Sequence, residues 1–203
     1  MHTALKRSLS RSSFERVLFL DADNLPLRNP DFLFDAPEFE HGAVFWPDAE
    51  PMTATRGAAE LRRAYQIPAN DGPEFETGQI LIDKRKCWRE LCLTMHLNRY
   101  PEFYYPYLFG DKETFRFCFD ALAGRYTLVQ SPTRRSLYAL LQSWVDGSPL
   151  FFHRAGGPAK WTKRYPPIPW FPHDVFAGFR RDLAAVRQDH VELRGDTFQG
   201  VVF

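Results

Sequence analysis

The sequence has no excess of charge of either sign. Its 203 residues include 26 Lys and Arg against 25 Asp and Glu, which gives a net charge of +1. Like charges gather only in short pairs such as Arg62-Arg63 and Arg180-Arg181. Because a protein that binds a phosphate backbone carries a clustered basic surface, the sequence predicts no nucleic-acid partner.

Cysteines and long apolar runs are also scarce. The three cysteines, Cys87, Cys92 and Cys118, form neither a disulfide framework nor the spacing of a zinc site. No window approaches the roughly 18 consecutive apolar residues of a transmembrane span. The first residues lack the apolar stretch of a secretory signal. The sequence therefore predicts a soluble chain with no visible transmembrane or targeting segment, and the odd number of cysteines leaves the redox compartment open.

What the sequence does contain is the pattern of one α/β domain. Its composition, 44% hydrophobic and 25% charged, is ordinary for a globular protein. Short apolar runs typical of buried strands alternate with segments of helical spacing. Strands are predicted at 17–20, 43–46, 79–82, 126–129 and 150–152. Helices are predicted at 58–65, 84–98, 112–122 and 174–188.

The first predicted strand ends in two carboxylates, Asp21 and Asp23, one residue apart. Ligands of open α/β sheets bind beyond the carboxyl ends of the strands. Two carboxylates at such a turn can converge on a divalent cation, and Mn²⁺ or Mg²⁺ accepts oxygen ligands while keeping positions for substrate phosphates. The alternative is a solvated turn at a strand end, where Asp is common.

Six segments, taken in order over roughly residues 14–161, resemble the fungal-type α-mannosyltransferases that extend mannan and the outer chains of N-glycans. The segments are FERVLFLDADNLP (14–26), NPDFLF (29–34), GAVFWPD (42–48), FETGQ (75–79), GDKETFR (110–116) and PLFFHR (149–154). The resemblance implies a GT-A-type fold with a mixed sheet flanked by helices. It also implies GDP-mannose as donor, an oligosaccharide or glycoprotein acceptor, Mn²⁺ (or Mg²⁺), retention of the anomeric configuration, and the Golgi lumen.

In that setting the metal ligands would be Asp21, Asp23 and His153. Asp23 would be the main ligand, with Asp21 on the metal or on the donor ribose. His153 closes a short apolar strand, as a late histidine ligand does in related glycosyltransferases, although a histidine bonded to backbone at a strand end is the alternative. Lys160, followed by Trp161, could reach the donor diphosphate.

Two further segments supply candidate substrate contacts. In the first, Gly78 permits close approach of the backbone to a ligand, and Glu76 and Gln79 could bind sugar hydroxyls. In the second, Asp111 and Lys112 open a helix, where Asp111 has an alternative role as N-cap. Either Glu76 or Asp111 would face the anomeric carbon, and the sequence does not choose between them.

Late in the chain, Gln142 matches a glutamine that precedes the final strand in the family. Trp161, Trp170 and Phe171 could stack on acceptor sugar or belong to the core.

The chain departs from the family at its N-terminus. Only a short segment precedes the strand that ends at Asp21, so the earlier strands of a GT-A domain, the stem and the membrane anchor are expected to be missing. We therefore expect an N-terminally truncated catalytic domain over residues 1–203. Two alternatives remain: a non-catalytic sugar-binding or partner-binding domain, and a haloacid-dehalogenase-type phosphatase that would use Asp21 as nucleophile.

Overall fold

The computed structural model of the protein describes Leu9 and residues 12–21, 23–51, 56–70, 72–108, 110–135 and 139–154. The chain divides into two units, Met1–Ala155 and Gly156–Phe203, and every described residue lies in the first. A single catalytic domain over residues 1–203 therefore stays a prediction. The helix predicted at 174–188 lies outside the described residues, as do Lys160, Trp161, Trp170 and Phe171.

Two four-stranded sheets form the centre of the first unit. The first sheet has the order β1-β4-β3-β5 and the second has the order β2-β8-β7-β6. The first sheet contains β1 (Arg16–Leu20), β3 (Ala43–Pro51), β4 (Pro73–Asp83) and β5 (Thr127–Leu128). The second contains β2 (Asn24–Pro26), β6 (Arg134–Arg135), β7 (Leu140–Ser143) and β8 (Pro149–His153). Of the described pairs, β3 with β5 is parallel and the others are antiparallel, so the first sheet is mixed.

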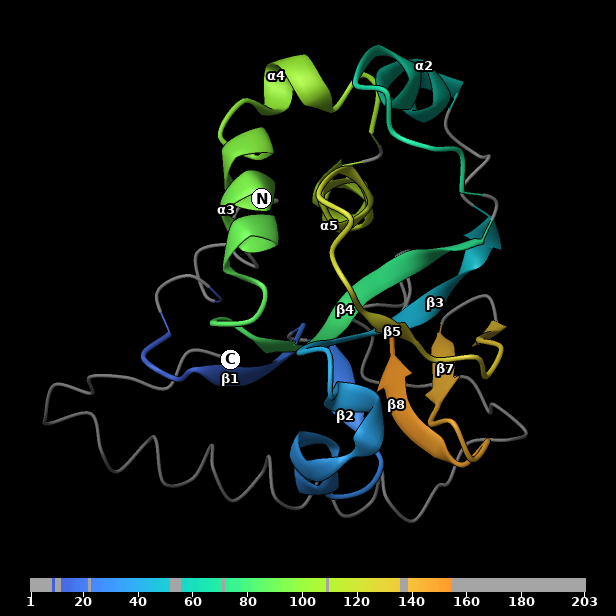
Figure 1. The fold of residues 1–203 in the computed structure, drawn as a ribbon. Helices are drawn as coiled ribbons and strands as arrows, with labels where there is room; N and C mark the ends of the chain where they lie inside the picture. Colours follow the sequence, from blue (N-terminus) through green and yellow to red (C-terminus); the bar gives the residue numbers. More distant parts are fainter. Residues whose placement is uncertain are drawn as a thin grey trace, which may run out of the picture. The chain divides into compact units, whose positions relative to one another are not determined.

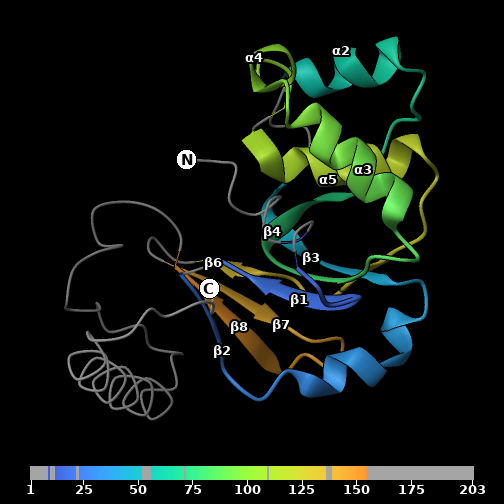
Figure 2. The same ribbon diagram turned by 90° about the vertical axis from the view of Figure 1, so that its left-hand side faces the viewer.

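Helices cover one face of the first sheet, and the second sheet covers the other (Figures 1 and 2). The α-helices are α2 (Arg56–Ala64), α3 (Trp88–Leu97), α4 (Pro101–Tyr104) and α5 (Gly110–Ala121). Two 3-10 helices, η1 (Asp31–Asp35) and η2 (Pro37–Phe39), follow β2 along the chain. The mixed α/β class is therefore as predicted, and it is compatible with a GT-A-like fold.

The core has one layer on each side of the first sheet, because successive residues of a strand point to opposite faces. On β3, Phe45 packs under the helices, with Phe119 edge-on at a centroid distance of 5.1 Å. The next residue, Trp46, packs between the sheets at 5.1 Å from Phe151, and its indole Nε1 donates to the carbonyl oxygen of Ser143 at 3.1 Å. Burial on both faces explains why these strands are continuous apolar runs rather than alternating ones.

Several predicted boundaries differ from the structure. The strand predicted to begin at Gln79 begins at Pro73, so the FETGQ segment lies within β4 instead of preceding it. The strand predicted to stop at Pro47 continues to Pro51, with an irregular register between those two prolines. Proline is tolerated there because an irregular ladder does not need every backbone N–H.

The strand predicted from residues 17–20 is an edge strand. Its side chains are half-buried: Val17 and Phe19 pack against the core under the helices, and Leu18 and Leu20 pack against the core between the sheets. Both faces are covered, as expected, but β1 has a neighbouring strand on one side only among the described residues.

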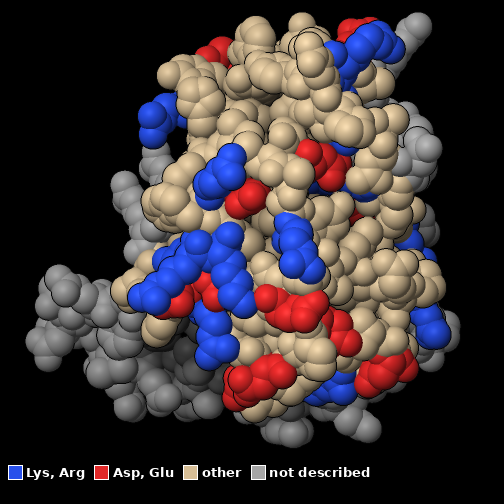
Figure 3. Space-filling view, viewed as in Figure 1, with Lys and Arg blue, Asp and Glu red and all other residues tan. Residues whose placement is uncertain are grey.

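The remaining sequence expectations concern membranes, thiols and charge. No helix among the described residues is long and apolar enough to cross a membrane. Cys87, Cys92 and Cys118 are free thiols, two of them buried. On the face drawn in Figure 3, acidic and basic side chains intermingle over the lower half, while the part over the helices carries few charges.

Candidate metal-binding site

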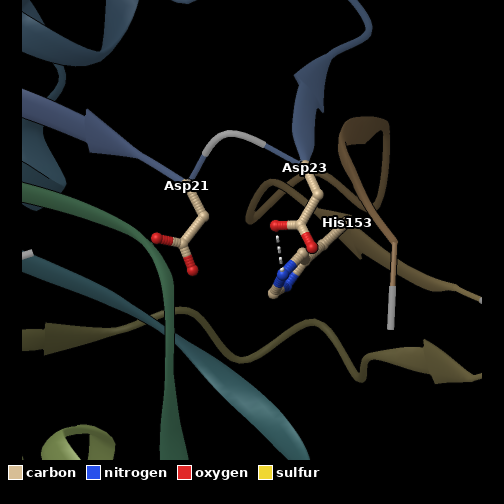
Figure 4. A group of neighbouring side chains, drawn as sticks. All are labelled: Asp21, Asp23 and His153. Atoms are coloured by element: carbon tan, nitrogen blue, oxygen red, sulfur yellow. Dashed lines mark ion pairs between the residues drawn. The ribbon is translucent and has the colours of Figure 1, made fainter. Parts of the chain in front are cut away.

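A cluster of two carboxylates and one imidazole lies where the chain passes from the first sheet to the second. Asp21 follows β1, Asp23 precedes β2, and His153 ends β8. One ligand atom from each of these side chains lies within 4.8 Å of the others. Figure 4 shows the carboxylates of Asp21 and Asp23 on the same side of the turn, with the ring of His153 beside Asp23. The structure thus brings together the three metal ligands expected from the sequence.

The turn between Asp21 and Asp23 is held to both sheets by backbone hydrogen bonds. The N–H of Asp21 donates to the carbonyl of Gly78 at 2.8 Å, and the N–H of Asn24 donates to the carbonyl of Asp21 at 2.8 Å. The N–H of Arg154 donates to the carbonyl of Asp23 at 3.0 Å. The two aspartates are therefore fixed relative to β4 of one sheet and β8 of the other.

The side chain of Asn24 acts as a second clamp. Its Nδ2 donates to the carbonyl of Gly78 at 2.9 Å and to Oε1 of Gln79 at 2.5 Å. Asn24 also lies directly opposite His153 in the pairing of β2 with β8. This clamping role depends on the pairing of strands far apart in the chain, which the sequence does not display.

β4 has a bulge next to the cluster. Phe45 of β3 pairs with Ile80, but the next residue, Trp46, pairs with Glu76, so 77–79 have no partners on β3. Bulges bend a strand and redirect its side chains, and they are frequent next to active sites. Here the bulge contains Gly78.

Gly78 is in contact with the ring of His153. A Cβ placed on Gly78 would lie 2.5 Å from Cε1, 2.6 Å from Nδ1 and 3.1 Å from Nε2 of that imidazole. In the structure the space beside Gly78 is taken by the imidazole of His153, and close approach of a ligand to this glycine stays a prediction.

His153 is flanked by carboxylates on both of its ring nitrogens. Nε2 lies 3.3 Å from Oδ1 of Asp23, and Nδ1 lies 3.6 Å from Oε1 of Glu76. Burial alone would lower the pKa of His153, but the contact with Asp23 and the charge of Glu76 outweigh it and raise that pKa. The imidazole therefore lies in a strongly negative environment.

Asp21 shows the same accumulation of negative charge. Burial raises the pKa of Asp21 to about 6; His153 opposes the shift, and the charges of Asp23, Glu76 and Asp111 add to it. A cation placed among these groups would relieve both the burial and the repulsion, because an opposite charge nearby favours the ionised carboxylate. Two carboxylates with one imidazole form the mixed oxygen and nitrogen ligand set that suits Mn²⁺, and oxygen ligands suit Mg²⁺.

Glu76 and Asp111, the two carboxylates predicted to contact substrate, have different surroundings. Oε1 of Glu76 accepts the backbone N–H of Gly78 at 2.9 Å, so it is engaged inside the protein. Asp111 lies within the first turn of α5, not at the N-cap position considered from the sequence. Its charge adds to the raised pKa of Asp21, but less than the charges of Asp23 and Glu76 do.

Lys112 is paired with a residue that the sequence analysis missed. Its ammonium group forms an ion pair with the buried carboxylate of Asp48, at the end of the GAVFWPD segment. Burial lowers the pKa of Lys112, but the bond to Asp48 and the charges of Asp48, Glu76 and Glu74 together raise it. Lys112 therefore stays protonated near Glu76, and its ammonium group is already paired with Asp48.

The two glutamines predicted to bind substrate are buried. Gln79 is 0% exposed and its Oε1 holds Asn24, while Gln142 is 1% exposed. Both amide atoms of Gln142 lack a hydrogen-bond partner among the described residues. In this conformation Gln79 supports the turn, and Gln142 lies on β7, out of reach of solvent. The substrate roles of both glutamines stay predictions.

Comparison with known proteins gives a family and several relatives. The family model described as "Mannosyltransferase putative" matches residues 7–71 and 68–136. Alpha-1,2-mannosyltransferase MNN24 of Candida albicans is 38% identical over 143 residues, which covers 51% of this chain and 20% of the relative. MNN21 of the same organism is 32% identical over 166 residues, covering 58% of this chain and 24% of the relative. MNN2 of Saccharomyces cerevisiae is 28% identical over 153 residues, covering 53% and 25%.

The matched region contains most of the candidate site. Asp21, Asp23, Glu76 and Asp111 lie within the part of the chain that the family model matches, and His153 lies beyond it. The chain spans between 20% and 30% of the length of the curated relatives it matches. Because the family model matches more than half of the chain, the chain belongs to the mannosyltransferase family.

Proposed function

We propose that this chain carries the donor-sugar site of a metal-dependent, retaining α-mannosyltransferase of GT-A type. The observation that carries the proposal is the convergence of Asp21, Asp23 and His153 from two different sheets onto one small volume. Membership of the mannosyltransferase family supports mannose as the transferred sugar and argues against the phosphatase alternative.

The ligand set supports a divalent cation that binds a nucleotide diphosphate. Asp21, Asp23 and His153 would hold Mn²⁺ or Mg²⁺, and such a cation supplies Lewis-acid stabilisation of the charge on the leaving diphosphate. The chain's own residues fix that position, since the backbone bonds of the turn hold Asp21 to β4 and Asp23 to β8.

The remaining roles follow from the surroundings of each group. Asp111 is the candidate carboxylate for the anomeric carbon, because one oxygen of Glu76, the alternative, is engaged by the Gly78 amide. Lys112, held by Asp48, would contribute positive charge near the donor. GDP-mannose as donor, a glycan acceptor, the α-1,2 linkage in the relatives' names and the Golgi lumen belong to the same proposal.

Calorimetric titration of GDP and of UDP, with and without Mn²⁺, tests the donor site. We expect GDP to bind only with Mn²⁺, and Asp23→Ala to weaken that binding by about 10-fold or more because it removes a metal ligand. Asp146→Ala, which changes an exposed aspartate in the turn after β7, is the matched control and should bind as wild type does.

Transfer of mannose from GDP-mannose to an oligomannose acceptor would then define the donor and, by NMR of the product, the linkage. A folded wild-type protein that binds neither nucleotide would overturn the proposal. Binding of oligomannose without metal or nucleotide binding would instead identify a non-catalytic relative.

A further inference from the structure

Glu76 lies near the second ring nitrogen of His153, the histidine of the proposed metal site, while Asp23 lies near the first. Its Oε1 is 3.6 Å from Nδ1 of His153, while Nε2 of the same ring is 3.3 Å from Oδ1 of Asp23. All three side chains are largely buried, with 10% of the Glu76 side chain and 12% of the His153 side chain exposed. The imidazole thus has one nitrogen toward the metal ligands and the other toward Glu76.

A histidine that binds a metal through Nε2 must carry its proton on Nδ1, because the coordinating nitrogen gives up its own. That Nδ1–H needs an acceptor, and ligating histidines almost always donate it to a carboxylate, a carbonyl or water. Nδ1 of His153 is buried and has no hydrogen-bond partner among the described residues. The nearby acceptor that the structure offers is Oε1 of Glu76.

We propose that Glu76 is a positioning residue for His153: its carboxylate accepts the Nδ1–H, holds the ring against Gly78 and fixes the tautomer that presents Nε2 to the metal. The inference rests on the proposed function, since it needs His153 to be a metal ligand. It adds a role for Glu76 that differs from the sequence-based hypothesis of a carboxylate facing the anomeric carbon.

The geometry of β4 supports this role. The same Oε1 accepts the N–H of Gly78 at 2.9 Å, which anchors the carboxylate to the bulge. Gly78, which carries no Cβ, is also the residue against which the imidazole lies. A shift of about 0.7 Å would bring Nδ1 within hydrogen-bond distance of Oε1. Gly78 therefore leaves room for the imidazole of His153, and its amide N–H holds the carboxylate of Glu76 that would accept from that ring.

A carboxylate oxygen used in this way is not available to the donor sugar. Oε1 of Glu76 would be shared between the Gly78 amide and His153, both on the protein side of the cluster. Asp111 then remains as the candidate carboxylate for the sugar. The two acidic residues that the sequence left as alternatives thus receive different roles.

The test compares Glu76→Ala and Glu76→Gln with wild type and with Glu74→Gln. Glu74 is a matched control because it is also a buried glutamate on β4. Mn²⁺ affinity is measured by calorimetry without nucleotide, and folding by circular dichroism. We expect Glu76→Ala to raise the Kd for Mn²⁺ by about 10–100-fold. Glu76→Gln should have a smaller effect because its amide oxygen still accepts, and Glu74→Gln should have none.

The tautomer provides a second readout that a merely structural role would not move. In protein loaded with diamagnetic Zn²⁺, which accepts both imidazole and carboxylate ligands, and labelled with ¹⁵N at histidine, the ring nitrogens of His153 should report a proton on Nδ1, and Glu76→Ala should lose that preference. Assignment uses a His153→Gln variant.

Two results would overturn the inference. One is wild-type Mn²⁺ affinity in a folded Glu76→Ala variant, including the case where mannose transfer is lost, which would place Glu76 at the sugar. The other is a folded wild-type protein that does not bind Mn²⁺, which would remove the proposed metal-dependent function as well. The first leaves the proposed function standing, so the two failures are distinguishable.

Discussion

A methyl group added at Gly78 should displace His153 from the candidate site. In Gly78→Ala the new Cβ would lie 2.5 Å from Cε1 and 2.6 Å from Nδ1 of the imidazole, well inside contact distance. The ring must retreat by about 1 Å to restore ordinary van der Waals separation. Gly78 does not have a left-handed backbone, so alanine is strained here only by this contact.

The magnitude follows from two separate costs. Overpacking in a well-packed region destabilises a protein by about 1–3 kcal/mol, which we expect as a loss in the free energy of unfolding. Metal–ligand distances tolerate only about 0.2 Å, so a displacement of about 1 Å should remove His153 from the ligand set. The Kd for Mn²⁺ should then rise by at least about 10-fold.

A double-mutant cycle in urea isolates the contact between Gly78 and His153. The cycle uses wild type, Gly78→Ala, His153→Ala and the double variant, and it does not depend on metal. In the His153→Ala background the new methyl group occupies space left by the ring, so Gly78→Ala should cost less than about 0.5 kcal/mol there. Equal costs of Gly78→Ala in both backgrounds would refute the argument.

Gly147→Ala is the matched control for the measurement of Mn²⁺ affinity in Gly78→Ala. Gly147 has a left-handed φ of 79° and nothing within 4 Å of an added Cβ. Alanine should therefore cost about 1 kcal/mol of stability from backbone strain while Mn²⁺ affinity stays unchanged. A loss of Mn²⁺ affinity in Gly147→Ala would show that general destabilisation, and not displacement of His153, weakens the site.

Two further predictions concern buried charge outside the metal cluster. Burial raises the pKa of Glu74 to about 7 from an ordinary 4.5, so wild type should lose stability as the pH rises from about 4.5 through 7, by about 3 kcal/mol. Because glutamine does not ionise, the free energy of unfolding of Glu74→Gln, measured in urea, should fall by about 3 kcal/mol less than that of wild type between pH 4.5 and 8. Parallel pH profiles of stability for the two proteins would contradict the raised pKa of Glu74. Asp120 pairs with Arg62 at 2.8 Å, with 11% and 8% of their side chains exposed. Asp120→Ala should cost about 3–5 kcal/mol by leaving the arginine buried and unpaired; a loss below about 1 kcal/mol would show that Arg62 is satisfied by the carbonyl of Pro68 alone.

The sequence located most of the first sheet because burial on both faces leaves a local signal. Residues 17–20, 43–46 and 79–82 are apolar runs, and each lies in a strand of that sheet. The helices α2, α3 and α5 were likewise visible from their spacing of apolar residues. Such signals come from neighbours in the sequence, which a single chain displays directly.

The second sheet was only partly predictable. Of its strands, β8 alone was predicted; β2, β6 and β7 contain two to four residues each. Strands of this length carry too few residues to show a period, and Asn24–Pro26 has the composition of a turn. What makes β2 a strand is its pairing with β8, far along the chain.

The candidate site shows the same division. Asp21, Asp23 and His153 could be predicted because each ends or follows an apolar run and because the segments resemble a family. The packing of His153 against Gly78 and the hydrogen bonds of Asn24 could not be predicted. Both depend on a bulge and on the register between distant strands. Gln142 is buried, which its place in the sequence did not indicate, and its substrate role stays a prediction.

If the proposed cation binds at the cluster, its position would couple metal binding to the packing of the two sheets. Asp21 is fixed to β4 of the first sheet, whereas Asp23 directly precedes β2 and His153 ends β8 of the second. Neither sheet alone supplies the three ligands, so the site exists only when the sheets are docked, as they are by the core around Trp46. A cation that binds only the docked arrangement stabilises it by mass action. The Asp-x-Asp turn is therefore both one of the covalent links between the sheets and the point where a bound cation would hold them together.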